Sequence, residues 1–220
     1  MQVVRKRCLP LFVCLIAVAL LATLSQAQKT PGITESTIRI GSCSALSGPA
    51  SFLGIQTQLG ALAYFHLIND QGGVNGRTIE LKSRDDGYDP ERTSTCFDDL
   101  LKDNVFAMGF FVGTPTAAKY IPMAESAKIP VVGLFTGAQM LYEPLKHEII
   151  NVRASYFDET REQVDSLWRI RGVRKIAVIY QDDAFGKTVL EECNELWPGI
   201  SRHRLLSAPS SAIRWTFRQV

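Results

Sequence analysis

VFAMGFF, residues 105–111, is an uninterrupted apolar run, and one residue later the chain continues with GTPT at residues 113–116. Seven residues without polar alternation predict a β-strand that is covered on both faces, as in a parallel sheet. The glycine and the proline predict a break and then the first turn of a helix, which we expect to reach about Ala127. A buried strand that passes directly into a helix indicates an α/β fold.

The same alternation of strands and helices extends toward both ends of the chain. Further strands are expected at residues 37–43, 78–83, 130–134, 148–152 and 175–180. Further helices are expected at residues 56–69, 90–102, 157–169 and 186–196. In the first of these helices, Leu59, Leu62, Ala63 and Phe65 are expected near one side. The alternation predicts a parallel sheet with helices on both faces, and from about Pro198 onward no period is visible.

The first 27 residues have the three parts of a secretory signal peptide. Three basic residues at positions 5–7 precede an almost wholly apolar run at residues 9–24, and Ser25-Gln26-Ala27 places small residues where a signal peptidase cuts. We therefore expect cleavage after Ala27 and a periplasmic location. An uncleaved membrane anchor is the alternative, although the run is short for a bilayer span.

The mature chain would be close to electrically neutral. Its leader holds three basic residues and no acidic ones, so removing it changes the formal charge from +2 to about −1. Binding to nucleic acid requires concentrated basic surface, so this composition gives no reason to expect a nucleic-acid partner.

Three cysteines remain after the leader, at Cys43, Cys96 and Cys193. Their number is odd and their spacing matches no zinc motif, so we expect buried or unpaired thiols, with one disulfide as the alternative. A nucleophilic role for Cys43 would need a base from His66, His147 or His203, and a packed thiol at a strand end is favoured instead. The motifs of serine hydrolases, phosphate-binding loops and dinucleotide-binding turns are absent, so we expect no catalytic residue, cofactor or metal.

Two acidic pairs stand between a strand end and a helix start. Asp85-Asp86 and Asp182-Asp183 would be metal ligands or acid–base partners in an enzyme. At a helix start, however, Asp accepts backbone N–H bonds and complements the helix dipole, so capping is the favoured interpretation.

The loops that follow the strands carry small and hydroxyl-bearing residues. They are Ser47-Gly48-Pro49, Gly113-Thr114-Pro115-Thr116 and Thr136-Gly137-Ala138. In an open parallel sheet, ligands bind outside the carboxyl ends of the strands. The free N–H groups of a helix start suit a carboxylate, although ordinary turn chemistry accounts for these residues equally well.

A set of short motifs spread over residues 36–197 carries a family resemblance. In chain order the motifs are Ile40-Gly41 with Ser47-Gly48-Pro49 and Gly54; Asn69 with Gly72-Gly73-Val74-Asn75-Gly76-Arg77; Asp85-Asp86-Gly87-Tyr88-Asp89-Pro90; Gly113-Thr114-Pro115-Thr116; Phe135-Thr136-Gly137-Ala138; Arg153; and Tyr180-Gln181-Asp182-Asp183-Ala184-Phe185-Gly186. Together and in this order they resemble the branched-chain amino-acid (leucine/isoleucine/valine) binding proteins of ABC importers.

The resemblance implies a type I periplasmic binding fold, with a first α/β lobe at residues 28–152 and a partial second lobe at residues 153–220. In that family the loops after the third and fourth strands hold the ligand's carboxylate. The corresponding residues here are Gly113, Thr114, Phe135, Thr136 and Gly137. The best-known members have serine where this chain has Gly113, so Thr114 is expected to supply the hydroxyl. Leu53 from the first lobe, and Phe185 and Tyr156 from the second, complete the expected site.

The function implied is that of an extracytoplasmic solute-binding component of an ABC importer. Its expected partners are an amino acid or similar small carboxylate and a membrane permease, and it is expected to be monomeric. A ligand-sensing domain that reports to a receptor or regulator is the alternative. Family members continue well beyond 220 residues. We therefore expect an incomplete second lobe without the acidic partner for the ligand's amine, and weak amino-acid binding.

Overall fold

A parallel sheet in the order β2-β1-β3-β4-β5 is the centre of the computed structural model, which describes residues 30–173 and 178–196. Its strands are β1 (Thr37–Ser44), β2 (Thr78–Asp85), β3 (Ala107–Gly109), β4 (Val131–Val132) and β5 (Ile149–Ile150). Every neighbouring pair runs parallel. The predicted α/β class with a parallel sheet is therefore confirmed. The predicted leader and the chain beyond Leu196 lie outside the described residues.

The strands after β2 are shorter than the sequence predicted. β1 and β2 pair over their full length, from Thr37 beside Thr78 to Ser44 beside Asp85. In contrast, only three residues of the apolar run 105–111 belong to β3. Phe110 (φ 62°) and Gly133 (φ 66°) adopt the left-handed conformation, which ends the regular ladder soon after β3 and β4. Of the strand expected at 175–180, residues 178–180 are not in a strand, and 174–177 lie outside the described residues.

The predicted helices are present, with small changes at their ends. They are α2 (Ser51–Asp70), α3 (Pro90–Lys102), α4 (Thr114–Ala127), α5 (Tyr156–Asp165) and α6 (Ala184–Leu196), with a 3₁₀ turn η1 (Gln139–Leu141) and a π-helical turn η2 (Ser166–Ile170) after α5. Asp183 caps α6 by accepting a hydrogen bond from the Gly186 N–H at 3.0 Å, as predicted. The cap of α3 is Asp89, not the predicted pair Asp85-Asp86, because Asp89 accepts from Glu91 N–H at 2.8 Å.

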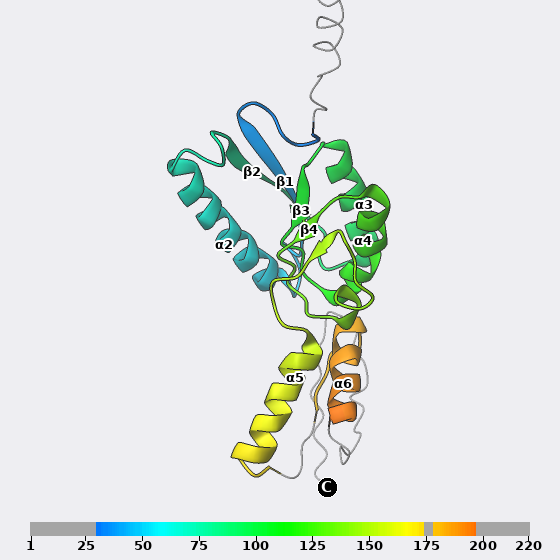
Figure 1. The fold of residues 1–220 in the computed structure, drawn as a ribbon. Coiled ribbons are helices and arrows are strands. Elements are labelled where there is room, and N and C mark those ends of the chain that lie inside the picture. Colours follow the sequence, from blue (N-terminus) through cyan, green and yellow to red (C-terminus); the bar gives the residue numbers. More distant parts are fainter. Residues whose placement is uncertain (1–29, 174–177, 197–220) are drawn as a thin grey trace, which may run out of the picture. The chain divides into compact units, whose positions relative to one another are not determined.

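Helices cover both faces of the sheet: α2 lies on one side, and α3 and α4 lie on the other (Figure 1). The main core lies between the sheet and α3 and α4, where several large side chains are fully buried: Phe97, Leu100, Met108, Phe111 and Tyr120. The Phe111 ring packs edge-on against Tyr120 at 4.6 Å and against Phe97 at 6.3 Å. These edge-to-face contacts fix the strand end that leads into the loop at Gly113.

α2 packs by a close backbone approach near its start and by the Phe65 ring, which lies edge-on to Phe110 at 5.7 Å. A Cβ at Gly54 would lie 1.9 Å from the Ala45 carbonyl oxygen, so only glycine fits there. Its buried residues are Gly54 and Ala61, whereas Leu59 is exposed although the sequence placed it on the packed side. Among the described helices, none has the length and apolar character needed to cross a bilayer.

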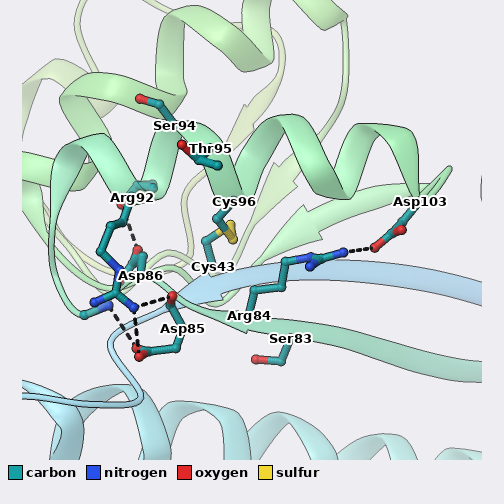
Figure 2. Close-up of a disulfide and its surroundings, with 12 residues drawn as sticks. Cys43, Ser83, Arg84, Asp85, Asp86, Arg92, Ser94, Thr95, Cys96 and Asp103 are labelled. Atoms are coloured by element: carbon teal, nitrogen blue, oxygen red, sulfur yellow. Dashed lines mark hydrogen bonds and ion pairs between the residues drawn. A yellow bond between two sulfur atoms is a disulfide. The ribbon is translucent and has the colours of Figure 1, made fainter.

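A disulfide joins Cys43 at the end of β1 to Cys96 in α3 (Figure 2). The expectation of unpaired thiols is therefore wrong for this pair, while Cys193 is free. The two cysteines are 53 residues apart in the sequence, so the pairing could not be read from their spacing. The fold places their Cα atoms 6.1 Å apart. A disulfide sulfur has no thiolate to attack with, which rules out Cys43 as a nucleophile in this structure. His66 and His147 are exposed, and His203 lies outside the described residues.

Candidate functional site

The loops that leave the carboxyl ends of the strands meet at one edge of the sheet, because all the strands run in the same direction. One carboxylate fixes two of these loops. Asp85 accepts hydrogen bonds from the N–H groups of Leu46 (2.8 Å), Ser47 (3.1 Å) and Gly87 (2.9 Å), and it forms an ion pair with Arg92 at 3.0 Å. Partial burial raises the pKa of Asp85, but the hydrogen bonds from Ser47, Leu46 and Gly87 outweigh burial and hold it below its usual range. Figure 2 shows Asp85 beside Arg92.

The structure brings two of the three hydroxyl-bearing loops together, those at Thr114 and Thr136. Thr114 Oγ1 and Thr136 Oγ1 are 2.8 Å apart and share a hydrogen bond, and both side chains are almost fully buried. A parallel bridge between Val112 and Phe135 holds the loops in register, with Phe135 N–H donating to the Phe111 carbonyl at 2.8 Å. The hydroxyl of Thr114 at the start of α4 and that of Thr136 in the loop after β4 thus form the polar centre of the candidate site.

Gly113 precedes α4 in a conformation that excludes other residues. Its φ of 112° lies in the region that L side chains rarely adopt, and a Cβ there would lie 2.6 Å from Cε2 of Tyr88. A serine at this position, which the resemblance would lead one to expect, therefore has no room. Thr114 follows directly, and its hydroxyl pairs with that of Thr136.

The start of α5 is attached to the loop after β4. The Tyr156 N–H donates to the Gly137 carbonyl at 2.7 Å, and the Tyr156 side chain is buried. A Cβ at Gly137 would lie 2.8 Å from the Ala154 carbonyl oxygen, so the close approach depends on glycine. Tyr156 and Gly137, two of the predicted site residues, are in direct contact.

Aromatic rings continue from Tyr156 to α6 and to the loop after β4. The Phe185 ring lies edge-on to Tyr156 at 5.3 Å. The Arg153 guanidinium lies over the rings of Tyr156 (5.3 Å) and Phe135 (5.7 Å), and it forms an ion pair with Glu159. Phe135 itself is 41 % exposed. Leu53 lies in the first turn of α2 and is 39 % exposed, so it borders the same edge of the sheet without being enclosed.

Two residues at this edge were not predicted as site residues. Arg153 and Tyr88 were both quoted only as part of the resemblance. The sequence does not show that the charge of Arg153 lies over two rings, nor that Tyr88 lies in a left-handed turn. Tyr88 has a φ of 66° and donates its hydroxyl hydrogen to Asp183 Oδ2 at 3.3 Å.

The edge holds polar groups of both signs. α4 begins at Thr114, α5 at Tyr156 and α6 one residue before Phe185, so three helix starts lie near the threonine pair and the aromatic rings. The start of α5 is capped by the Ser155 side chain and that of α6 by the Asp183 carboxylate, whereas α4 has no side-chain cap. The Arg153 guanidinium is paired with Glu159. The start of α4, with partial positive charge and the two hydroxyls, is therefore the place at this edge best suited to an anion.

Comparison with known proteins gives consistent matches. The family model described as periplasmic binding protein matches residues 37–198. The Leu/Ile/Val-binding protein homolog 3 of Brucella melitensis is 25 % identical over 154 residues, which is 68 % of this chain and 41 % of the relative.

Solved structures agree with this match. A possible leucine/isoleucine/valine-binding protein from Rhodopirellula baltica is 34 % identical with a TM-score of 0.69, over 78 % of this chain and 46 % of that chain. A fatty acid ABC transporter substrate-binding protein from Thermomonospora curvata is 26 % identical with a TM-score of 0.69, over 79 % and 45 % of the two chains. The chain thus spans less than half the length of these relatives.

Proposed function

The chain belongs to the periplasmic binding protein family, and we propose that it is the solute-binding component of an ABC importer that captures a small carboxylate between two lobes. The first lobe would comprise residues 28–152, and residues 153–220 would belong to the second. Proteins of this family bind solutes and do not catalyse reactions, which agrees with the absence of a predicted catalytic residue. The sensor alternative has no specific observation in its favour.

The Thr114–Thr136 hydroxyl pair is the observation that carries the proposal. A hydroxyl can rotate its hydrogen toward a new acceptor, and a carboxylate has two oxygens with room for several hydrogen bonds. A ligand carboxylate at this position accepts one bond from each threonine. In the first turn of α4, Thr114 and Thr116 keep N–H groups that a ligand could use, because Pro115 has none and the Ala117 N–H donates to the Gly113 carbonyl at 3.2 Å.

The rest of the ligand would be apolar. Phe135, Tyr156 and Phe185 supply rings beside the hydroxyl pair. The relatives named for leucine, isoleucine and valine and the one named for a fatty acid share a ligand chemistry, a carboxylate joined to a hydrocarbon group. We therefore propose an amino acid or a related carboxylate of this kind as the ligand.

The proposed location is outside the cytoplasm, where the protein would act as a monomer and deliver its ligand to a membrane permease. We place the leader at residues 1–27, with cleavage after Ala27. The intact mass of the exported protein checks this, with Gln28 expected as the first residue. A mature protein that retains the leader would contradict the proposed cleavage.

The site is tested by replacing each hydroxyl with a methyl group. Thr114→Val and Thr136→Val are expected to weaken binding of a carboxylate by about 1–3 kcal/mol each, because a polar group of the ligand loses its partner. NMR titration of the labelled chain with L-leucine, L-valine and hexanoate measures this, since chemical shifts report even weak binding.

Thr95→Val is the matched control, because Thr95 is an exposed residue of α3. It is expected to leave the titration unchanged. If both site variants respond to the three probes as the wild-type chain does, the carboxylate site is not at these threonines.

A further inference from the structure

The turn between β2 and α3 fixes Tyr88 in an unusual conformation. Its φ of 66° lies in the left-handed region, which costs a residue with a Cβ about 1–2 kcal/mol. The cost is offset by hydrogen bonds: Tyr88 N–H donates to Asp86 Oδ1 at 2.9 Å, and Asp89 N–H donates to the Asp86 carbonyl at 3.0 Å. Asp86 is itself buried and accepts from the Thr93 hydroxyl at 2.8 Å. The backbone therefore holds the tyrosine in one direction.

The ring of Tyr88 occupies the room beside Gly113. Its Cε2 and Cδ2 atoms would lie 2.6 Å and 3.1 Å from a Cβ at Gly113. The ring thus stands where a side chain from the loop after β3 would otherwise stand. The Tyr88 ring fits at this place because residue 113 has no side chain.

The hydroxyl of Tyr88 reaches a different part of the chain. It donates to Asp183 Oδ2, and the same carboxylate accepts the Gly186 N–H of α6 through Oδ1 and the Gln181 side-chain amide through Oδ2. Burial, and then the nearby charge of Asp183, raise the pKa of Tyr88. The hydroxyl therefore stays protonated at physiological pH and remains a donor. One hydrogen bond joins the β2–α3 turn to the cap of α6 across 95 residues of sequence.

We propose that Tyr88 is a positioning residue of the candidate site, whose ring replaces the side chain absent at Gly113 and whose hydroxyl tethers α6 to the first lobe. The tether holds the start of α6, with Phe185, beside Tyr156 and the threonine pair. The inference rests on the proposed function in one respect, because it assumes that Phe185, Tyr156 and the threonine pair face a ligand. The hydrogen bond between Tyr88 and Asp183 does not depend on a ligand.

Hydrogen–deuterium exchange of the 220-residue chain tests the tether without any ligand. In Tyr88→Phe the ring stays and the hydroxyl is lost, so amides of α6 are expected to exchange about fivefold faster while those of β1 do not change. Tyr64→Phe removes the hydroxyl of an exposed tyrosine of α2 and is the matched control. It is expected to leave both elements at the wild-type rate.

A double variant tests whether the Tyr88 hydroxyl acts through Asp183. Asp183→Ala removes both the acceptor of Tyr88 and the cap of α6, so Tyr88→Phe added to it is expected to cause no further acceleration. Two results would overturn the proposal: α6 exchange in Tyr88→Phe at the wild-type rate, or effects of the two substitutions that multiply in the double variant. The exchange result is independent of the threonine titration. A failed carboxylate site and a failed tether can therefore be told apart.

Discussion

Glu192 brings a carboxylate into the interface between α5 and α6, where the residue is only 6 % exposed. Burial disfavours its charged form, and the negative charge of Glu195 adds to this, so the pKa of Glu192 is raised to about 7. The hydroxyl of Thr160, a buried residue of α5, partly opposes the shift. At neutral pH this helix pair therefore contains a carboxyl that is close to half protonated.

The raised pKa makes the stability of the chain dependent on pH. Between about pH 4.5 and pH 7 the folded chain binds a proton at Glu192 that the unfolded chain has lost, so stability falls as the pH rises through this window. We expect the chain to be about 1–2 kcal/mol less stable at pH 8 than at pH 5, less than the full shift because solvent screens part of it. Glu192→Gln is expected to remove this dependence.

Urea unfolding at the two pH values measures the effect, with Glu191→Gln as the control at an exposed neighbour on the same helix. The control is expected to keep the wild-type pH profile. A wild-type chain that is equally stable at pH 5 and pH 8 would show that Glu192 is ionised without cost in the folded state.

Single residues were predictable from the sequence where their type and their position indicated the same role. Thr114 and Thr136 bear hydroxyls, follow strands and begin helices or turns, so a parallel sheet had to bring them to one edge. Tyr88 could not be found in this way. Its role depends on a left-handed φ and on a glycine that lies 25 residues away in the sequence, and only the folded chain shows both.

At the level of elements, the order and type of the strands and helices were predicted and the strand lengths were not. Residues 105–111 are all apolar because most of them are buried, but only Ala107–Gly109 pairs with neighbouring strands. Hydrophobic pattern reports burial, whereas the ladder also requires extended dihedral angles, which Phe110 does not have. An apolar run is therefore a good predictor of a buried strand and a poor predictor of its ends.

α2 shows the same limit for a helix. It is apolar on several sides, so periodicity alone could not identify the packed side. The packed side is set by Gly54, whose missing side chain allows the helix to approach the Ala45 carbonyl. Leu59 and Leu67 are consequently exposed, although a count of apolar residues would place them in the core.

For the whole molecule, the Cys43–Cys96 disulfide closes a loop that runs from the end of β1 through α2 and β2 to the middle of α3. Disulfides form and persist in oxidising compartments and are rare in the cytosol. The pair therefore supports the proposed location outside the cytoplasm. It also connects β1, which lies between β2 and β3 in the sheet, to the helix α3 on the opposite side of the sheet from α2 (Figure 1).

Reducing this disulfide is expected to destabilise the whole chain. The bond closes a loop with a sequence separation of 53 residues. In the chain-entropy model, closing a loop of that size stabilises the folded state by about 4 kcal/mol, because the unfolded chain loses conformational freedom.

Urea unfolding with and without dithiothreitol measures the difference. The Cys193→Ala variant is used, so that within residues 28–220 only the Cys43–Cys96 pair responds to the reductant. The urea midpoint should fall clearly under reducing conditions. Equal midpoints would mean that the reduced chain is already held together by the Phe97, Leu100 and Phe111 core, and that the disulfide adds no stability.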